Sequence, residues 1–314
     1  MKVIRIIRPG LCATIQDRGR FGFQDRGIPV SGAMDPWAFR VGNLLVGNSP
    51  EAASIEITLG GLEAEILADT CLAVTGAHSA ASLNGDPIPI WTAVEVRSGD
   101  RLGISFARNG ARDYLSLAGG VQVPPVMGSC STYLRGCFGG LEGRALRKGD
   151  IIESGLPAGK ALIVAVPPDL IPPYAHLFTL RVVLGPQDDE ITGAGLQTFL
   201  NSRYCVTQRS DRMGCVLDGP EIRHRKGPDI ISDGTAFGSI QVPGSGRPII
   251  LMADRQTTGG YVKIATVITC DLPLIGQALP GYAVRFQAVT VQEAQDLLRT
   301  REKALGNFLT TNLL

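Results

Sequence analysis

Short runs of β-branched and other apolar residues recur along this chain, and glycine turns separate them. Between residues 52 and 106 the pattern predicts six strands, at 54–59, 63–67, 71–75, 80–83, 93–96 and 102–106. The intervening turns contain Gly60-Gly61, Gly76, Asn84-Gly85 and Ser98-Gly99-Asp100. Strands that recur every 8–12 residues or so, each followed by a turn signal, are typical of a β-sandwich or β-barrel. The sequence therefore predicts a mainly β fold.

The length of the chain, 314 residues, exceeds what one ordinary hydrophobic core supports, so two domains are expected. The 39 glycines and 20 prolines favour a turn-rich β architecture over a helical bundle. A group of prolines near the middle of the chain has the composition of a linker: Pro157, Pro167, Pro168, Pro172 and Pro173. We therefore predict an N-terminal domain at 1–170 and a C-terminal domain at 171–314.

The formal net charge of +1 at pH 7 gives no electrostatic footprint for binding nucleic acid or an anionic membrane. The longest apolar runs, such as 161–166, are far too short to cross a bilayer. Seven cysteines occur without a Cys-x-x-Cys pair, and the start of the chain lacks the pattern of a secretory signal. We expect a cytoplasmic protein with reduced thiols, and neither a nucleic acid nor a membrane as partner.

Two helices have clear predicted boundaries. Asp35-Pro36 suits the N-cap and first position of a helix that ends at Gly47. Thr290-Val-Gln-Glu293 is a capping box, and it predicts a helix that extends to Leu305 and stops at Gly306.

Two places depart from the regular strand pattern. Glu56 lies between Ile55 and Ile57, and this alternation predicts that its carboxylate faces solvent or a cleft. Residues 126–149 are rich in glycine and have no strand period, so they are expected to form a long ordered loop. Loops of this length inside a compact domain are usually functional or mobile.

Polar side chains gather in three loops between predicted strands. In the first loop, Gln16, Asp17 and Arg20 lie next to the aromatic residues Phe21 and Phe23. A ligand-binding loop and a salt-bridged surface turn are both consistent with this grouping.

The second and third polar loops lie in the C-terminal half. The second contains Arg209, Asp211 and Arg212. The third separates the apolar runs 249–253 and 264–268, and its chemistry-bearing residues are Asp254, Gln256, Thr257, Thr258, Gly259, Gly260, Tyr261 and Lys263. The adjacent glycines allow positive φ or a close approach to a ligand. A solvated hairpin loop explains the same residues.

These residue types suit a site for an anion or a polarised carbonyl group. Arginine and lysine would hold a carboxylate or phosphoryl group. Amides and hydroxyls would orient a carbonyl, and Asp17, Asp211 or Asp254 would transfer protons. The alternative is that the charges form intramolecular ion pairs that brace two barrels.

Several common catalytic motifs are absent from the sequence. It contains no Gly-x-x-x-x-Gly-Lys-Ser/Thr loop, no His-Glu-x-x-His and no Gly-x-Ser-x-Gly. Its three histidines are scattered, so no metal site is expected. Without a Met-Lys-Met sequence, no covalent biotin is expected on this chain.

A set of motifs along almost the whole chain resembles the family called biotin-dependent carboxyltransferase-like, or allophanate hydrolase subunit 2-like. The N-terminal half carries Thr14-Ile-Gln-Asp-Arg-Gly-Arg20, Gly32-Ala-Met-Asp35, Asn43-Leu-Leu-Val-Gly-Asn48, Glu56-Ile-Thr58, Pro125-Val-Met-Gly-Ser129 and Gly139-Gly-Leu-Glu-Gly-Arg144. The C-terminal half carries Ser210-Asp-Arg-Met-Gly214 and Gln256-Thr-Thr-Gly-Gly-Tyr261. The family includes the C subunit of 5-oxoprolinase, the Kip-antagonist protein and part of urea carboxylase, and the resemblance is nearest to the first two.

The resemblance implies two cyclophilin-like β-barrel domains with a few short helices. It implies one subunit of 5-oxoprolinase, inactive alone, whose partners are the A subunit of that enzyme and a protein like its B subunit, which is also Kip inhibitor-like. That complex uses ATP to open 5-oxo-L-proline to L-glutamate. The family also leaves open a regulatory module that antagonises a Kip inhibitor-like partner of a sensor kinase, and a carboxyltransferase of the urea carboxylase type.

For the oxoprolinase hypothesis we select site residues from the three polar loops. Arg212, Gln256 and Lys263 are predicted to bind an anion or carbonyl, with Asp211 and Asp17 assisting the catalysis. The remaining substrate-binding candidates are Gln16, Arg20, Arg209, Thr257, Thr258, Gly259, Gly260 and Tyr261.

Overall fold

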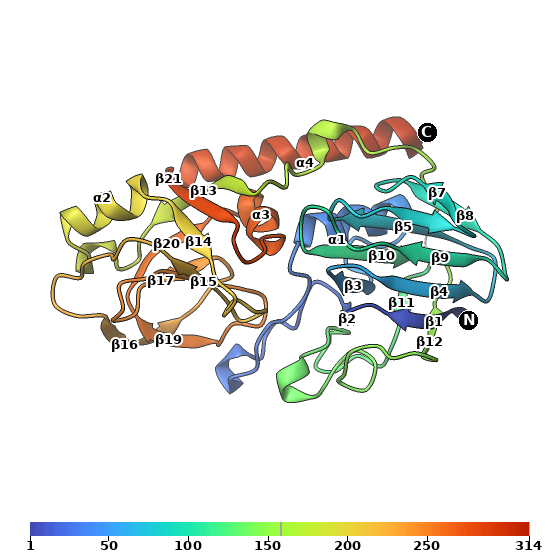
Figure 1. The fold of residues 1–314 in the computed structure, drawn as a ribbon, viewed down its shortest axis with the longest axis horizontal. Coiled ribbons are helices and arrows are strands. Elements are labelled where there is room, and N and C mark those ends of the chain that lie inside the picture. The colour runs from blue at the N-terminus through green and yellow to red at the C-terminus, as the bar shows by residue number, and fades with distance from the viewer. Residues whose placement is uncertain (158, 314) are drawn as a thin grey trace. The chain divides into compact units, whose positions relative to one another are not determined.

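The computed structural model describes residues 1–157 and 159–313, which form a mainly β protein of two compact units (Figure 1). The first unit comprises Met1–Phe21, Ser31–Pro172 and the chain from Leu305 onward. The second comprises Gly22–Val30 and Pro173–Ala304. The mainly β prediction is confirmed. Each unit contains chain from both sides of residue 170, which a division at a single point does not describe.

The first unit consists of two antiparallel sheets. The seven-stranded sheet has the order β11 (Val121–Gln122), β12 (Ile151–Ser154), β1 (Lys2–Pro9), β4 (Leu62–Ile66), β9 (Arg101–Ile104), β6 (Ala81–Leu83) and β7 (Asp86–Ile88). The five-stranded sheet has the order β2 (Cys12–Gln16), β3 (Ser54–Thr58), β10 (Arg112–Leu117), β5 (Thr70–Gly76) and β8 (Ala93–Val96).

Alternating side chains explain how the two sheets share one core. In β4, Leu62, Ala64 and Ile66 are buried, whereas the intervening Glu63 and Glu65 are partly exposed. The buried set joins apolar side chains from both sheets in a single cluster. A period of two along a strand places these residues on one face, which is the signal that made the strands predictable.

The five-stranded sheet is buried on both faces because α1 (Pro36–Leu45) covers the side away from the shared core. Asp35 caps this helix as predicted, accepting hydrogen bonds from the N–H groups of Trp37 and Ala38 at 3.1 and 2.9 Å. Glu56, predicted to face solvent or a cleft, is instead buried beneath the start of the helix. There its carboxylate accepts the Tyr114 hydroxyl at 2.7 Å. Alternation gives the face of a strand, and tertiary packing determines whether that face is covered.

The second unit contains a closed barrel and a separate two-stranded ribbon. The barrel order is β13 (Leu177–Leu184), β20 (Lys263–Val267), β17 (Ser239–Gln241), β18 (Ile249–Leu251), β15 (Gly214–Asp218), β14 (Tyr204–Val206) and β21 (Ala283–Ala288). All its pairs are antiparallel except β13 with β21. The ribbon pairs β16 (Asp229–Gly234) with β19 (Thr258–Tyr261).

Short helices complete the structure. In the second unit α2 (Gly193–Asn201) packs on β21, where Phe199 stacks on Phe286 with ring centroids 4.3 Å apart. The other short helical segments are α3 (Leu272–Gly276), η1 (Gln24–Arg26), η2 (Leu134–Gly136), η3 (Pro168–Leu170), η4 (Asp188–Glu190) and η5 (Thr269–Asp271).

The C-terminal helix α4 (Val291–Leu313) begins as predicted but does not end as predicted. The Thr290 N–H donates to the Glu293 carboxylate at 2.7 Å, and the Glu293 N–H donates to Thr290 Oγ1 at 3.2 Å. The predicted stop at Gly306 is wrong, because a glycine ends a helix by adopting positive φ and Gly306 does not adopt it. Inside a helix, glycine costs only about 1 kcal/mol relative to alanine.

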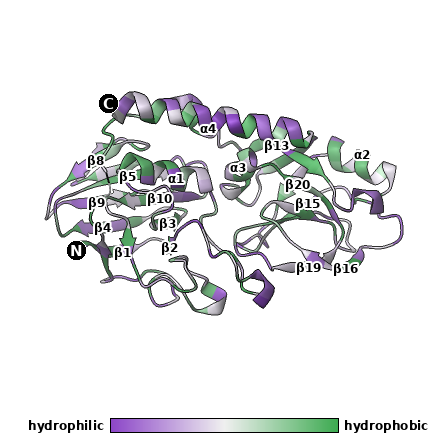
Figure 2. Ribbon diagram, turned by 180° about the vertical axis from the view of Figure 1, so that it is seen from behind, coloured by the Kyte–Doolittle hydropathy of each residue, from purple (hydrophilic) through white to green (hydrophobic). Residues whose placement is uncertain are grey.

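Helix α4 carries mainly hydrophilic residues, as its colours in Figure 2 show. Within residues 1–157 and 159–313, no helix combines the length and apolar character needed to cross a membrane.

The segment predicted as an open polar loop between 254 and 263 contains strand β19. Neither Gly259 nor Gly260 has a positive φ, so the conformational reason expected for them is wrong. Close packing explains Gly259 instead. A Cβ there would lie 2.3 Å from Nε2 of Gln241, whereas one at Gly260 would meet nothing closer than 3.5 Å.

Candidate functional site

Asp17, at the end of β2, binds four donors from its own chain. Its carboxylate accepts hydrogen bonds from Ser129 Oγ at 2.7 Å, from the Cys130 N–H at 2.6 Å, from the Gly19 N–H at 2.8 Å and from the Ser131 hydroxyl. A carboxylate offers about four acceptor positions, so this one is close to saturation.

Arg20 and Gln16 hold the same glycine-rich loop. The Arg20 guanidinium is fully buried, donates to the carbonyls of Val126 and Ser131, both at 2.9 Å, and lies over the Phe138 ring at 4.8 Å. Gln16 Nε2 donates to the Thr132 carbonyl at 3.2 Å. We call Gln16, Asp17 and Arg20 the loop latch. Its hydrogen bonds explain why residues 126–149 are ordered without extended strands, as predicted.

Arg212 and Asp254 bind one another in the second unit. Nε and Nη2 of Arg212 donate to the two carboxylate oxygens of Asp254 at 2.9 and 3.0 Å, a bidentate pair that is largely buried. The exposed Asp211 accepts the N–H groups of Met213 and Gly214, at 2.7 and 3.1 Å, and so shapes its own turn. Arg209 is exposed beside that turn. The second polar loop is therefore braced mainly by its own contacts.

Lys263, the first residue of β20, is a buried cation with an exposed counter-ion. Its Nζ donates to Asp233 Oδ2 at 3.0 Å, and the two side chains are 3% and 55% exposed. The Lys263 N–H donates to Gln187 Oε1 at 3.2 Å, and the Gln187 N–H returns a hydrogen bond to the Lys263 carbonyl at 3.1 Å. The hydrogen bond from Lys263, aided by the Gly234 N–H, holds the pKa of Asp233 below its ordinary value.

Two amides extend this polar group. Gln241 of β17 is the cross-strand partner of Lys263, so both side chains leave the same face of the barrel wall. Gln256 Nε2 donates to Gln241 Oε1 at 3.2 Å. Gln241 is only 2% exposed, and its Nε2 makes no hydrogen bond within the part of the chain that the structure describes. We call Gln187, Asp233, Gln241, Gln256 and Lys263 the barrel-end cluster.

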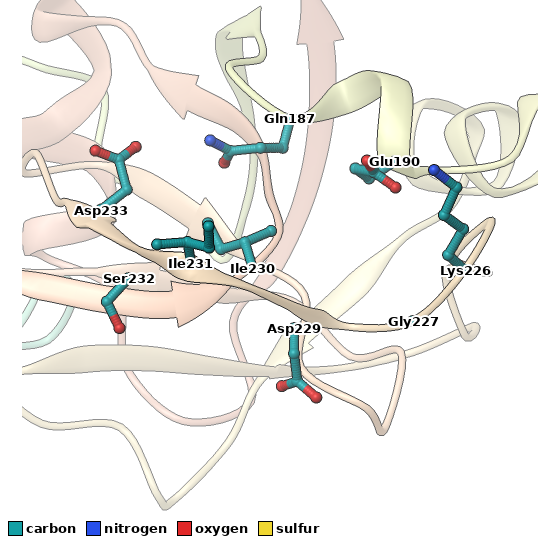
Figure 3. Close-up of a pocket in the computed structure, with 9 residues that line it drawn as sticks. All are labelled: Gln187, Glu190, Lys226, Gly227, Asp229, Ile230, Ile231, Ser232 and Asp233. Atoms are coloured by element: carbon teal, nitrogen blue, oxygen red, sulfur yellow. The ribbon is translucent and has the colours of Figure 1, made fainter.

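A hollow of about 600 Å³ opens beside the barrel-end cluster. Gln187 and Asp233 form part of its wall, and Figure 3 shows their side chains approaching one another on the same side of the β16 strand. Glu190 and Lys226 lie next to each other at the other end, while the carboxylate of Asp229 points away from Gln187. The cluster therefore presents one amide and the counter-ion of the buried Lys263 ammonium at an open cavity.

The other predicted side chains of the third loop, Thr257, Thr258 and Tyr261, lie on β19 or directly before it. The Thr257 carbonyl accepts the Thr235 N–H at 3.0 Å, which ties the start of β19 to the chain after β16. Thr258 and Tyr261 are exposed on β19, and Tyr261 pairs with Asp229.

Sequence reasoning found Lys263 and Gln256 but missed Gln187, Asp233 and Gln241. Gln241 had a visible signal, because it is a polar residue inside the otherwise apolar run Ile240-Gln241-Val242. Asp233 and Gln187 had none, since their contacts with Lys263 span 30 and 76 residues of sequence. Within the described ranges, no three histidine, cysteine, aspartate or glutamate residues are arranged to hold a metal ion.

Comparisons with known proteins find relatives that match most of the chain. The family profile described as carboxyltransferase domain, subdomain A and B, matches residues 26–288. The chain is 40% identical over 294 residues to the C subunit of 5-oxoprolinase from Escherichia coli strain K12, with 93% of each chain covered. It is 38% identical over 290 residues to the protein of the same name in Haemophilus influenzae, with 92% of each covered. The crystal structure of Kluyveromyces lactis urea carboxylase superposes on all of this chain with a TM-score of 0.93 at 31% identity, and the match spans 30% of that longer protein.

Proposed function

The chain belongs to the family described as carboxyltransferase domain, subdomain A and B, and from this premise we propose that it is the C subunit of an ATP-dependent 5-oxoprolinase. The observation that carries the proposal is the similarity to two proteins of that name, at 40% and 38% identity. Each alignment covers more than nine-tenths of this chain and of the relative. In the proposed complex, the enzyme's two other components, its A and B proteins, join it to open 5-oxo-L-proline to L-glutamate. The urea amidolyases that it matches are much longer, since the matched region is only 18% of each.

The barrel-end cluster offers the groups that such a substrate needs. 5-Oxo-L-proline carries a carboxylate and a lactam carbonyl. The Lys263 ammonium suits an anionic oxygen, and the unused N–H of Gln241 suits a carbonyl oxygen that gains negative charge. The lactam is a stable amide, and ATP, bound in the complex, would supply the phosphoryl group that activates its carbonyl oxygen. Proton-transfer roles for Asp17 and Asp211 stay predictions. The Asp17 carboxylate accepts the Cys130 N–H of the glycine-rich loop, and the Asp211 carboxylate accepts the Met213 N–H of its own turn.

Glutamate release tests the proposal. The chain is mixed with its two partner proteins, 5-oxo-L-proline and ATP, and each protein is omitted in turn. We expect glutamate only from the complete mixture. Unchanged glutamate release without this chain would contradict the proposal and favour a module that binds and antagonises the Kip inhibitor-like partner.

Substitution of Lys263 tests the site within the proposal. Lys263→Met keeps most of the length of the side chain and removes its charge. Glutamate release should therefore fall by at least about a hundredfold, the loss typical of a removed electrostatic contact to the reacting group. Lys303→Met, an exposed lysine on α4, is the matched control. Co-purification with the two partner proteins should be unchanged in both variants. Wild-type turnover of Lys263→Met would remove this lysine from the site.

A second candidate, carboxyl transfer, has one specific observation in its favour. The chain superposes over its whole length on part of a urea carboxylase. Because no Met-Lys-Met sequence is present, carboxybiotin would have to come from another chain. Transfer of labelled carboxylate from a carboxylated biotin-carrier protein to urea, with no glutamate formed from 5-oxo-L-proline, would favour this candidate.

A further inference from the structure

The Lys263 ammonium carries a charge that the fold neutralises in only one place. Its side chain is 3% exposed, and a buried cation is costly unless a counter-ion and hydrogen bonds compensate for lost hydration. Among the described residues, Asp233 is the one carboxylate paired with it. The neighbouring amides of Gln187 and Gln241 are neutral, so they do not balance its charge.

Asp233 is held less firmly than a buried counter-ion usually is. It lies on β16, which has a bulge between Asp229 and Asp233, so residues 230–232 have no partners in the β16–β19 ladder. Ile231, in the bulge, is 94% exposed, and Asp233 itself is 55% exposed. A strand with few ladder bonds and little buried surface opens at low free energy. The carboxylate can therefore leave Lys263 by turning into solvent.

The donors that hold Asp233 form a preassembled anion site. Its carboxylate accepts from the Lys263 ammonium at 3.0 Å and also interacts with the Gln187 side chain. The Gly234 N–H, at 2.7 Å, belongs to the same strand and would move with it. If Asp233 turned away from the wall of the 600 Å³ hollow, the Gln187 side chain would remain in that wall and the Lys263 ammonium would lose its paired carboxylate. The unused N–H of Gln241 lies on the same face of the barrel.

The other charged residues around the hollow do not act as a second counter-ion for Lys263. Glu190 and Lys226 carry opposite charges and lie at its far end (Figure 3). The carboxylate of Asp229 points to the opposite side of β16 (Figure 3). Removing Asp233 from Lys263 would thus leave a local positive charge that attracts an anion.

We propose that, in the free protein, the Asp233 carboxylate occupies the position on Lys263 that the anionic group of the ligand takes in the complex. When the ligand binds, its anionic group displaces Asp233. The ligand class is a small anion, carboxylate or phosphoryl, with a carbonyl oxygen within reach of Gln241. In the site of the proposed function, Asp233 therefore competes with the ligand for Lys263. The identity of the ligand rests on that proposed function. Binding of the external anion and pairing of Asp233 exclude one another, so the internal pair lowers the apparent affinity.

The test compares two aspartate variants of the full-length chain. Asp233→Asn keeps the shape of the side chain and removes the competing charge, whereas Asp229→Asn makes the same change four residues earlier on the same strand. The probes are 5-oxo-L-proline, inorganic phosphate and 2-pyrrolidone, a lactam without a carboxylate, and their dissociation constants are measured by calorimetry. We expect Asp233→Asn to bind the preferred anion about tenfold more tightly than wild type, the equivalent of one charge-assisted hydrogen bond. Asp229→Asn should match wild type, and 2-pyrrolidone should not gain affinity.

The choice of probes distinguishes a carboxylate site from a phosphoryl site, and the variants distinguish failure of this inference from failure of the proposed function. A gain for 5-oxo-L-proline identifies a carboxylate site, and a gain for phosphate alone identifies a phosphoryl site. Lys263→Met should abolish the gain when it is combined with Asp233→Asn. Equal or weaker anion binding by Asp233→Asn would overturn the proposal even if the complete complex still released glutamate, which would leave the proposed function standing.

A second measurement avoids dependence on the variant folding. In wild-type protein labelled with ¹³C, the carboxyl resonance of Asp233 should move as the anion saturates its site, because the carboxylate leaves the ammonium for water. The Asp229 resonance is the internal control. A saturating anion that leaves the Asp233 resonance in place would overturn the inference.

Discussion

The loop latch and the barrel-end cluster have similar residue types, but the fold holds their charged groups differently. In the latch, Asp17 accepts four hydrogen bonds from its own chain and the buried Arg20 is directed at backbone carbonyls. In the cluster, Lys263 has one exposed counter-ion and Gln241 retains an unused N–H. Both sets were candidates from sequence because a polar residue in a loop serves either purpose. A counter-ion that is exposed at the wall of a cavity, rather than the residue type, makes the cluster the better candidate for a ligand site.

The largest effect is expected from breaking the latch. Asp17→Ala leaves two backbone N–H groups and two hydroxyls without their acceptor, so the free energy of unfolding in urea should fall by about 3–5 kcal/mol. Asp86→Ala, an exposed carboxylate in the same unit, should change it by less than about 0.5 kcal/mol. Normal stability combined with lost substrate turnover in Asp17→Ala would return Asp17 to the list of catalytic candidates.

The Arg212–Asp254 pair should behave as a second brace. Arg212→Ala leaves the buried Asp254 carboxylate without its bidentate partner, and the unfolding free energy should fall by about 2–4 kcal/mol. The double variant Arg212→Ala, Asp254→Ala should be less destabilised than the sum of the two single variants, which a double-mutant cycle measures. If Arg212→Ala unfolds like wild type but the complex loses turnover, the original prediction of a substrate-binding role is favoured.

The adjacent glycines of β19 offer a matched pair at the barrel-end cluster. Gly259→Ala places a Cβ 2.3 Å from Gln241 Nε2, so the buried amide must shift, at a cost of about 1–3 kcal/mol. Gly260→Ala has ordinary contacts, with 3.5 Å to the nearest atom, and should be nearly neutral. Unfolding free energies and the affinity for 5-oxo-L-proline are measured for both. Equal affinities would show that the position of Gln241 does not matter for binding.

A separate prediction concerns a buried carboxylate with spare hydrogen-bonding capacity that no ligand can reach. Asp113 is completely buried, and Ser79 donates to it at 2.7 Å while its Oδ1 makes no hydrogen bond among the described residues. Burial raises its pKa from 3.8 to about 8, so the native state holds a proton that the unfolded chain releases above about pH 4.

The sign of the pH effect follows from this difference in bound protons. Between about pH 4 and pH 8 the native state binds more protons than the unfolded state, so this group's contribution to stability decreases as the pH rises through that range. Asp113→Asn keeps the shape and removes the titration. Urea unfolding at pH 5 and pH 8 should therefore show a smaller decline for the variant than for wild type. Parallel declines would contradict the assignment.

Local patterns predicted most of the fold. The alternation in β4, the Asp35 cap and the Thr290 capping box each depend on residues within a few positions of one another, and each is confirmed. The errors at Glu56 and Gly306 have a different origin. Burial of Glu56 depends on a helix that covers its strand, and the continuation of α4 depends on the backbone angle that Gly306 adopts.

Only part of the candidate site could be predicted from the sequence. Lys263 and Gln256 stood out because charges and amides near a glycine pair exceed what a turn requires. Asp233 lies in a stretch that reads as an ordinary strand end, and its role follows from a contact 30 residues away. Likewise, the saturation of Asp17 depends on donors 112 to 114 residues away. Long-range hydrogen bonds of this kind have no local signature.

The loop latch should also protect the glycine-rich loop from proteases. A glycine-rich stretch with few strand bonds normally offers an extended substrate to trypsin, and Arg135 is exposed within this one. Here the Tyr133 and Phe138 backbones are hydrogen-bonded to each other, and the Thr132 N–H donates to the Ile15 carbonyl at 2.9 Å. Cleavage therefore has to wait for local unfolding, and its rate follows the free energy of opening the latch. Four hydrogen bonds to one carboxylate thus help to set the lifetime of the protein in the presence of proteases.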